Sequence, residues 1–158
     1  MNKRDRKLGA ALVAAQIAAA STAFANNIQV SSVTLQSIDT TADTAMVQFN
    51  LSWENSWRVA TGPANHDAAW VFVKYHTGDL VWKTATLEVL DAAHVVPAAA
   101  TLDVGVNGTR GLGAFIYRAA TGSGNNAFNS IRLKWNYGAD GVTDSALVTL
   151  DVHAIEMV

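Results

Sequence analysis

A strict alternation of apolar and polar residues is the feature that most limits how this chain can fold. Between residues 44 and 54 every second side chain is apolar, from Ala45 to Trp53, and Met46 is the only break in the pattern. The same alternation returns at residues 130–137 and 146–154. A period of two places alternate side chains on opposite faces of a strand. The pattern therefore predicts β-strands with one buried and one exposed face.

Further strands are predicted where the alternation is less one-sided. Residues 69–75 are apolar on both faces, which indicates either a central strand covered on both sides or a strand that exposes aromatic rings. Residues 80–90 alternate loosely between apolar and polar side chains. Residues 113–118 form a short, mostly apolar run that follows a glycine-rich segment. Residues 27–38 predict a first strand, with a bulge or break near Ser31 because the apolar residues there fall out of phase.

Turn-forming residues separate these runs, and nothing after residue 26 shows a sustained helical period. Glycine, asparagine and aspartate tolerate the backbone conformations that tight turns require. They gather at residues 61–63, 77–79, 107–108, 122–126 and 138–141. Seven to nine strands divided in this way predict a single all-β domain at residues 26–158, an antiparallel β-sandwich. A partly closed barrel would show the same alternation.

The first 25 residues predict a cleavable export signal. They begin with four basic residues, continue with an almost wholly apolar run at 8–20, and end with small residues at Ala23 and Ala25, where a signal peptidase reads the chain. The run is shorter and richer in alanine than the roughly 20 strongly apolar residues of a membrane-spanning helix. The predicted mature chain is therefore residues 26–158, without a transmembrane segment, in the periplasm, on the cell surface or outside the cell.

The composition of the mature chain narrows its partners. Removal of the signal takes four basic residues and one acidic residue from totals of 11 and 13, which leaves 7 and 12 and a net charge of −5 with neutral histidines. Nucleic-acid binders usually carry a basic stripe, and none is visible, so nucleic acid is not expected as a partner. The chain has no cysteine, which excludes disulfides and thiolate metal sites.

A search for chemical motifs predicts no catalytic residue, no cofactor and no metal site. The chain has no Gly-x-Ser-x-Gly elbow, and its four histidines are widely scattered. Two polar loops contain residue types that can bind a metal. Turn chemistry is the preferred interpretation of Asn65-His66-Asp67, and the loop from Asp140 to Asp144 lacks the further spaced acidic ligands of an EF-hand.

The tryptophans are the remaining candidates for a site. Trp53 and Trp135 fall in phase with aliphatic neighbours, which predicts that both lie in the core. Trp57, Trp70 and Trp82 are not so clearly inward, and exposed tryptophans on a sandwich face can stack on sugar rings or dock a partner. Packing against loops or a second layer is the favoured alternative for these three, because tryptophan is highly buried on average.

Several blocks of the mature chain resemble a known family. These blocks are residues 52–58, 67–75, 113–118, 133–138 and 154–158. They are similar to the N-terminal module of secreted bacterial formylglycine-generating-enzyme-like (sulfatase-modifying-factor) proteins, and the similarity runs through nearly all of residues 26–158. The resemblance implies a β module that precedes a C-type-lectin-like catalytic domain, whose opening strand the last four residues resemble. That domain, with its copper-binding cysteine pair, has no counterpart here, so no catalytic residue is carried over.

These observations predict an exported, non-catalytic β-sandwich module for binding or self-assembly. One form is a filament or surface subunit, in which the first or last strand pairs between copies to make a homo-oligomer. A carbohydrate-binding module is one alternative, with a glycan stacked on Trp57, Trp70 or Trp82. A truncated N-terminal part of a sulfatase-modifying-factor-like protein is another.

Overall fold

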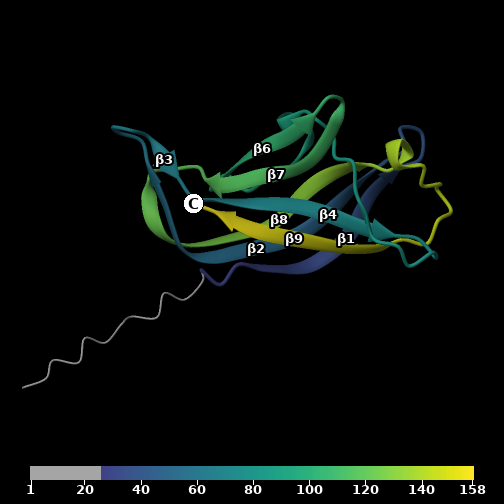
Figure 1. Ribbon diagram of the computed structural model, residues 1–158, viewed down its shortest axis with the longest axis horizontal. Coiled ribbons are helices and arrows are strands. Elements are labelled where there is room, and N and C mark those ends of the chain that lie inside the picture. The colour runs from purple at the N-terminus through teal and green to yellow at the C-terminus, as the bar shows by residue number, and fades with distance from the viewer. Residues whose placement is uncertain (1–25) are drawn as a thin grey trace, which may run out of the picture.

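Nine antiparallel strands form two sheets in the computed structural model, which describes residues 26–158 (Figure 1). The predicted all-β sandwich is confirmed. The predicted export signal at residues 1–25 lies outside the described residues. Two single turns of 3-10 helix, η1 (Asp91–Ala93) and η2 (Gly138–Asp140), interrupt the strands. In residues 26–158 no helix has the length and apolar character needed to cross a membrane.

The first sheet is built around a long central strand. Its members are β1 (Gln29–Asp39), β2 (Thr44–Val59), β8 (Gly122–Asn136) and the short β3 (Asn65–His66). Strand β2 pairs with β1 on one side and with β8 on the other. Strand β8 begins earlier than the sequence predicts. The glycine-rich residues 122–124, expected in a turn, pair with residues 56–58 of β2 because that strand continues past its own bulge.

The second sheet carries the strand that is apolar on both faces. Its members are β4 (Ala68–His76), β5 (Lys83–Thr84), β6 (Ala100–Asn107), β7 (Arg110–Arg118) and β9 (Thr149–Met157). Strand β4 pairs along its whole length with β9 and, on its other side, with β7 and β5. It is therefore the central strand of this sheet. The alternation at residues 146–154 predicts a strand, which the structure places at β9, and residues 142–148 before it are irregular.

The first strand shows the break that its sequence predicts. The register between β1 and β2 shifts between Ser31 and Thr34, and Ser32 adopts a φ of 56°. A second shift follows between Gln36 and Asp39, next to Ser37 with a φ of 47°. Such bulges bend and twist an edge strand, which makes it a poorer template for pairing with another chain.

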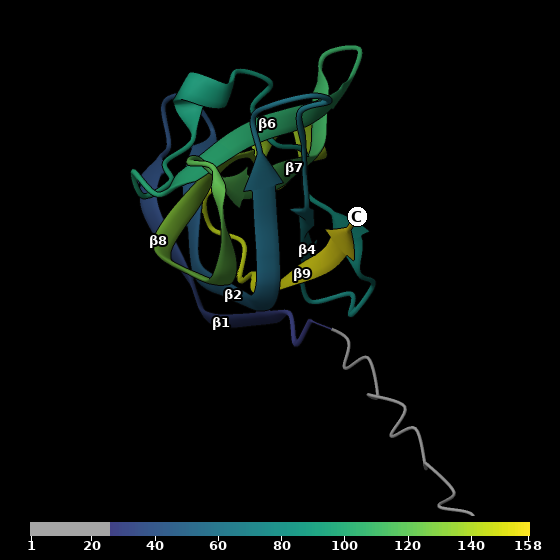
Figure 2. The same cartoon turned by 90° about the vertical axis from the view of Figure 1, so that its left-hand side faces the viewer.

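One short segment joins the two sheets. Leu87 exchanges backbone hydrogen bonds of 2.9 and 3.1 Å with Gly111 of β7, and its neighbours Thr86 and Glu88 bond to Asn136 and Lys134 of β8. The segment thus closes one side of the sandwich. In Figure 2 the strands surround the interior from β1 and β2, through β8, to β6 and β7, and on to β4 and β9.

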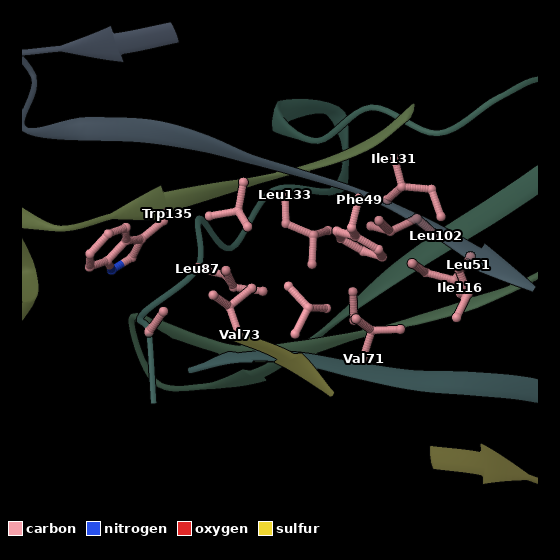
Figure 3. Packing of buried hydrophobic residues seen from close by; sticks show 14 of the residues in the cluster. Phe49, Leu51, Val71, Val73, Leu87, Leu102, Ile116, Ile131, Leu133 and Trp135 are labelled. Atoms are coloured by element: carbon pink, nitrogen blue, oxygen red, sulfur yellow. The ribbon is translucent and has the colours of Figure 1, made fainter. Parts of the chain in front are cut away.

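The core lies between the inward faces of the two sheets (Figure 3). Its largest fully buried apolar side chains come from β2, β4, β7, β8 and the joining segment. They are Val47, Phe49, Leu51, Trp53, Val71, Val73, Leu87, Ile116, Ile131, Leu133 and Trp135. The prediction that Trp53 and Trp135 are core residues is confirmed, since each is 1% exposed.

Each of these two core tryptophans donates its indole N–H to a buried aspartate. Trp53 Nε1 lies 2.6 Å from Asp67 Oδ2, and Trp135 Nε1 lies 2.7 Å from Asp140 Oδ2. Thr86 donates both its backbone N–H and its hydroxyl to Asp140. Buried polar groups are costly unless they are hydrogen-bonded, so these carboxylates satisfy the indoles that the core requires.

We expect the stability of the protein to fall below neutral pH because of the buried His94. Its Nδ1 accepts the backbone N–H of Lys134 at 2.9 Å, and its Nε2 lies 2.9 Å from the carbonyl of Glu88, so the ring is held neutral. Burial lowers the pKa of His94 below its ordinary value of about 6.5. The unfolded chain therefore binds a proton first as the pH falls, which destabilises the folded state below about pH 6.5.

The measurement is the free energy of unfolding in urea, at about pH 8 and about pH 5, for the wild type and for His94→Gln. The wild type should lose more stability between the two values than the variant does. Equal losses in the two proteins would contradict the assignment of this pH dependence to His94.

Candidate functional site

The outer faces of the two sheets differ sharply in chemistry. On the first sheet the outward positions of β2 and β8 carry polar side chains, including Gln48, Asn50 and Arg132. On the second sheet Trp70 and Phe72 of β4 point outward, because the residues that alternate with them, Ala69, Val71 and Val73, are buried in the core. We define the aromatic face as the outward side chains of this sheet and its margin, namely Trp70, Phe72, His76, Trp82, Phe115, His153, Ile155 and Met157.

Cross-strand pairing brings these residues together from distant parts of the sequence. Trp70 lies opposite Phe115 of β7 and Ile155 of β9, and its ring centroid is 4.6 Å from that of Phe115. Phe72 lies opposite His153, with the two rings stacked at 5.3 Å and an interplanar angle of 9°. The aromatic face is therefore a packed row of rings and not a set of isolated ones.

The far end of the row is formed by Trp82 and His76. Their rings meet edge to face at 4.6 Å. Trp82 is 47% exposed and lies just before β5, in a run with the exposed Leu80 and Val81. His76 follows Trp70 by six positions on β4, so the row is about 20 Å long at the usual rise of a strand.

Two glycines make room for Trp70. Its indole reaches from β4 across β7 to β6, and the tip of the six-membered ring lies over the backbone of Gly113 and Gly105, which pair with each other. A Cβ atom at Gly105 would lie 2.5 Å from that ring, and one at Gly113 would lie 2.7 Å from it. Side chains at these two positions would push the indole away from the sheet.

Opposite charges lie among the rings. Lys74 Nζ is 5.9 Å from the centroid of Phe72 and donates to Thr84 Oγ1 at 3.0 Å. Lys74 also lies opposite Asp151 of β9, whose carboxylate is 3.1 Å from His153 Nε2. One basic and one acidic side chain thus share the centre of the face, which leaves the face close to neutral and mainly apolar.

A second cluster of rings stands where β2 and β3 fold over the end of β7. His66 stacks on Tyr117 at 4.2 Å, and the guanidinium of Arg58 lies 5.3 Å from the same ring. The Tyr117 hydroxyl donates to Asp103 at 2.6 Å. Burial, together with that carboxylate, raises the pKa of Tyr117 to about 12. The phenol therefore stays protonated at physiological pH and serves as a fixed donor.

The aspartates of the two polar loops, Asn65-His66-Asp67 and Asp140 to Asp144, accept hydrogen bonds from the protein. Asp67 accepts the indole of Trp53 and further bonds from Ser56 and Trp57. Asp140 accepts bonds from Trp135 and Thr86, as described above. Asp144 accepts the Tyr137 hydroxyl at 2.7 Å, a bond that raises the pKa of Tyr137 to about 12. Within residues 26–158 no group of three or more His, Asp or Glu side chains is placed to hold a metal ion.

Two of the three candidate tryptophans lie on the aromatic face. Trp70 and Trp82 stand at its two ends, with Phe72 between them. Trp57 lies elsewhere, half-buried on β2 and paired with Ser123 of the first sheet. The sequence alone predicts that Trp70 and Phe72 lie on one side of a strand. That Phe115 and His153 join them is known only from the strand pairing, because β7 and β9 lie far from β4 along the chain.

No family model matches the chain, and neither a curated protein nor a solved structure matches it. The resemblance to the formylglycine-generating-enzyme-like family therefore stays a prediction from sequence. Because of its geometry, the aromatic face is the principal candidate for a functional surface.

Proposed function

We propose that this chain is an exported, non-catalytic β-sandwich unit that associates with a second copy of itself through the aromatic face. The contrast between the two outer faces carries the proposal. A sheet that faces water on one side normally shows polar residues there, as the first sheet does. A contiguous apolar patch on a soluble domain marks an interaction surface. The second sheet carries such a patch, and its rings continue to the edge strand β9.

The shape of the face favours a protein partner over a sugar. Stacking on a sugar requires an open ring face, whereas Phe72 stacks on His153 and Trp70 packs against Phe115 and two glycines. Aliphatic side chains at Ile155 and Met157, about half exposed, extend the patch beyond the rings. Aromatic and methionine side chains are enriched at protein interfaces, and charged residues are depleted from their cores.

The border of the face supports self-association. Strand β9 pairs with β4 through nine consecutive residues with no register shift, and no residue of β9 is a proline. In contrast, the edge strand β1 carries two bulges. Because a regular edge strand is a template for pairing, a second copy that covers the aromatic face would also shield this edge.

The test is the mass of the protein by light scattering over a range of concentrations, after purification from an exporting host. Wild type should form dimers or larger species as the concentration rises. Phe72→Glu should shift the equilibrium to monomer by about tenfold or more, because it places a charge in the apolar patch. Gln48→Glu makes the same change of charge on the polar face and should leave association unchanged.

A milder variant tests the same face without adding a charge. Gly105→Ala displaces the tip of Trp70 and should weaken association, whereas Gly78→Ala should not, because no heavy atom lies within 4 Å of a Cβ at Gly78. A wild type that stays monomeric at every concentration would overturn the proposal. So would association that Phe72→Glu leaves intact.

A carbohydrate-binding module is a second candidate, favoured by the exposure of Trp82 at the end of the row. Binding to a glycan array that Trp82→Ala and Trp70→Ala abolish would support it. The resemblance suggests a further partner for the same face, a C-type-lectin-like catalytic domain of the kind that follows this module in the family. If the protein stays monomeric and binds such a domain through Phe72, that partner replaces the second copy.

A further inference from the structure

A pocket of about 220 Å³ opens on the first sheet and shares no lining residue with the aromatic face. Three neighbouring strands contribute to it, because Ser52 of β2 pairs with Gln29 of β1 and with Ala127 of β8. The lining residues are Asn27, Gln29, Ser52, Trp53, Glu54, Asn125, Asn126 and Ala127. The pocket lies near the point where the described chain begins, since Asn27 and Gln29 are among its lining residues.

We call this cavity the amide pocket, because residues with side-chain carboxamides make up half of its lining. Four of the eight lining residues are asparagine or glutamine, and Glu54 supplies the one carboxylate. Gln29 Nε2 donates to Asn27 Oδ1 at 3.0 Å, and Asn27 Nδ2 lies 3.4 Å from Glu54 Oε1. Asn125 Oδ1 accepts the backbone N–H of Asn55 at 3.4 Å. The polar groups thus hold one another in place across two strands and a bulge.

A buried relay fixes the orientation of Asn126, which is 4% exposed. The carboxylate of Asp67 can only accept, so Ser56 donates its hydroxyl proton to Asp67 at 2.9 Å. The Ser56 oxygen then accepts a hydrogen bond from Asn126 Nδ2 at 2.7 Å. The amide nitrogen of Asn126 is therefore directed inward. The side chain of Asn126 lies on the same inward face as that of Trp53, with which it pairs, so this relay anchors β8 beside the pocket.

The geometry points to a binding site for a neutral, hydroxyl-rich ligand, such as one sugar unit of a glycan. The Glu54 carboxylate is an acceptor, and the side-chain amides of Asn27, Gln29 and Asn125 offer both donors and acceptors. Vicinal hydroxyls, which both donate and accept, match this set. The pocket is smaller than the 300–1,000 Å³ typical for drug-sized ligands, so it suits a single ring.

A metal ion fits the pocket less well. Calcium takes six to eight oxygen ligands and prefers several carboxylates, whereas Glu54 is the only carboxylate in the lining. A sugar also gains from the hydrogen bonds that already hold the side chains of Asn27 and Gln29, because preorganised polar groups lose little entropy when the ligand binds. The site is independent of the aromatic face, so either proposal can fail without the other.

The experiment is an NMR titration of the protein, purified after export, with the methyl glycosides of glucose, galactose, mannose and N-acetylglucosamine, and separately with calcium chloride. At least one glycoside should cause saturable shifts of the backbone amides of residues 52–54 and 125–127. Glu54→Ala and Asn125→Ala should each weaken that binding by about tenfold, since each removes hydrogen bonds to the ligand.

The matched control is Gln48→Ala, on the outer side of β2 but outside the lining, which should bind as the wild type does. Four glycosides that cause no saturable shift would overturn the inference. Shifts confined to the aromatic face would also overturn it, as would saturable binding of calcium alone. Spectra of the folded variants without ligand distinguish lost binding from lost structure.

Discussion

Substitution of Asp67 by alanine should cost about 3 kcal/mol or more of unfolding free energy. Three donors converge on this buried carboxylate, namely Trp53 Nε1 at 2.6 Å, Ser56 Oγ at 2.9 Å and the backbone N–H of Trp57 at 2.9 Å. Asp67 is fully buried, so water does not readily replace the lost oxygens. An unsatisfied buried donor costs about 1–3 kcal/mol, and the losses accumulate when several donors share one acceptor.

The measurement is urea unfolding followed by the combined fluorescence of the five tryptophans. Asp79→Ala is the control. Asp79 also accepts bonds from three groups, those of Thr77, Val81 and Lys83, but it lies at the surface, where water can replace it. Its removal should have a much smaller effect. Equal losses for the two variants would show that burial of the Asp67 network is not what stabilises this corner.

The same carboxylate also illustrates what the sequence could not predict. Asp67 stands in a polar loop, Asn65-His66-Asp67, where turn chemistry is the natural interpretation. Nothing local indicates that its partners are an indole fourteen residues earlier and the serine that orients Asn126 in the amide pocket. The pocket joins residues from three strands and could be found only from the strand pairing.

Local alternation predicted well wherever one face of a strand packs on the core. It identified β2, the second half of β8 and the inward direction of Trp53 and Trp135. It missed β6, although Ala100, Leu102, Val104 and Val106 alternate there with Thr101, Asp103, Gly105 and Asn107. Gly105 is kept small by the ring of Trp70 lying over it, a contact between distant strands that local sequence cannot reveal.

Residues 80–90 show the opposite case, in which a predicted strand is present only in pieces. The structure assigns only Lys83–Thr84 as a strand, and the following residues form isolated bridges. The reason is that their hydrogen bonds are divided between two sheets. Leu87 bridges to Gly111 on the second sheet and to Trp135 on the first, so no single partner extends the pairing into a ladder.

Leu87→Ala should destabilise the protein by about 2–5 kcal/mol, the range for removal of a buried leucine side chain. Leu87 is 0% exposed and lies where the joining segment spans β7 and β8. The backbone hydrogen bonds of the segment remain available to alanine, so the loss reports the packing of the side chain. The cavity would open between the sheets, where neighbours held in two ladders cannot easily collapse into it.

Leu147→Ala is the matched control, because Leu147 is 91% exposed in the irregular stretch before β9. It should change the unfolding free energy by no more than about 0.5 kcal/mol. Both variants are compared in urea, with fluorescence and far-UV circular dichroism as separate probes. Because Leu87 contacts both sheets, the two probes should report one shared transition at a lower midpoint. If the sheets separated in two steps, the joining segment would not be what makes the sandwich a single cooperative unit.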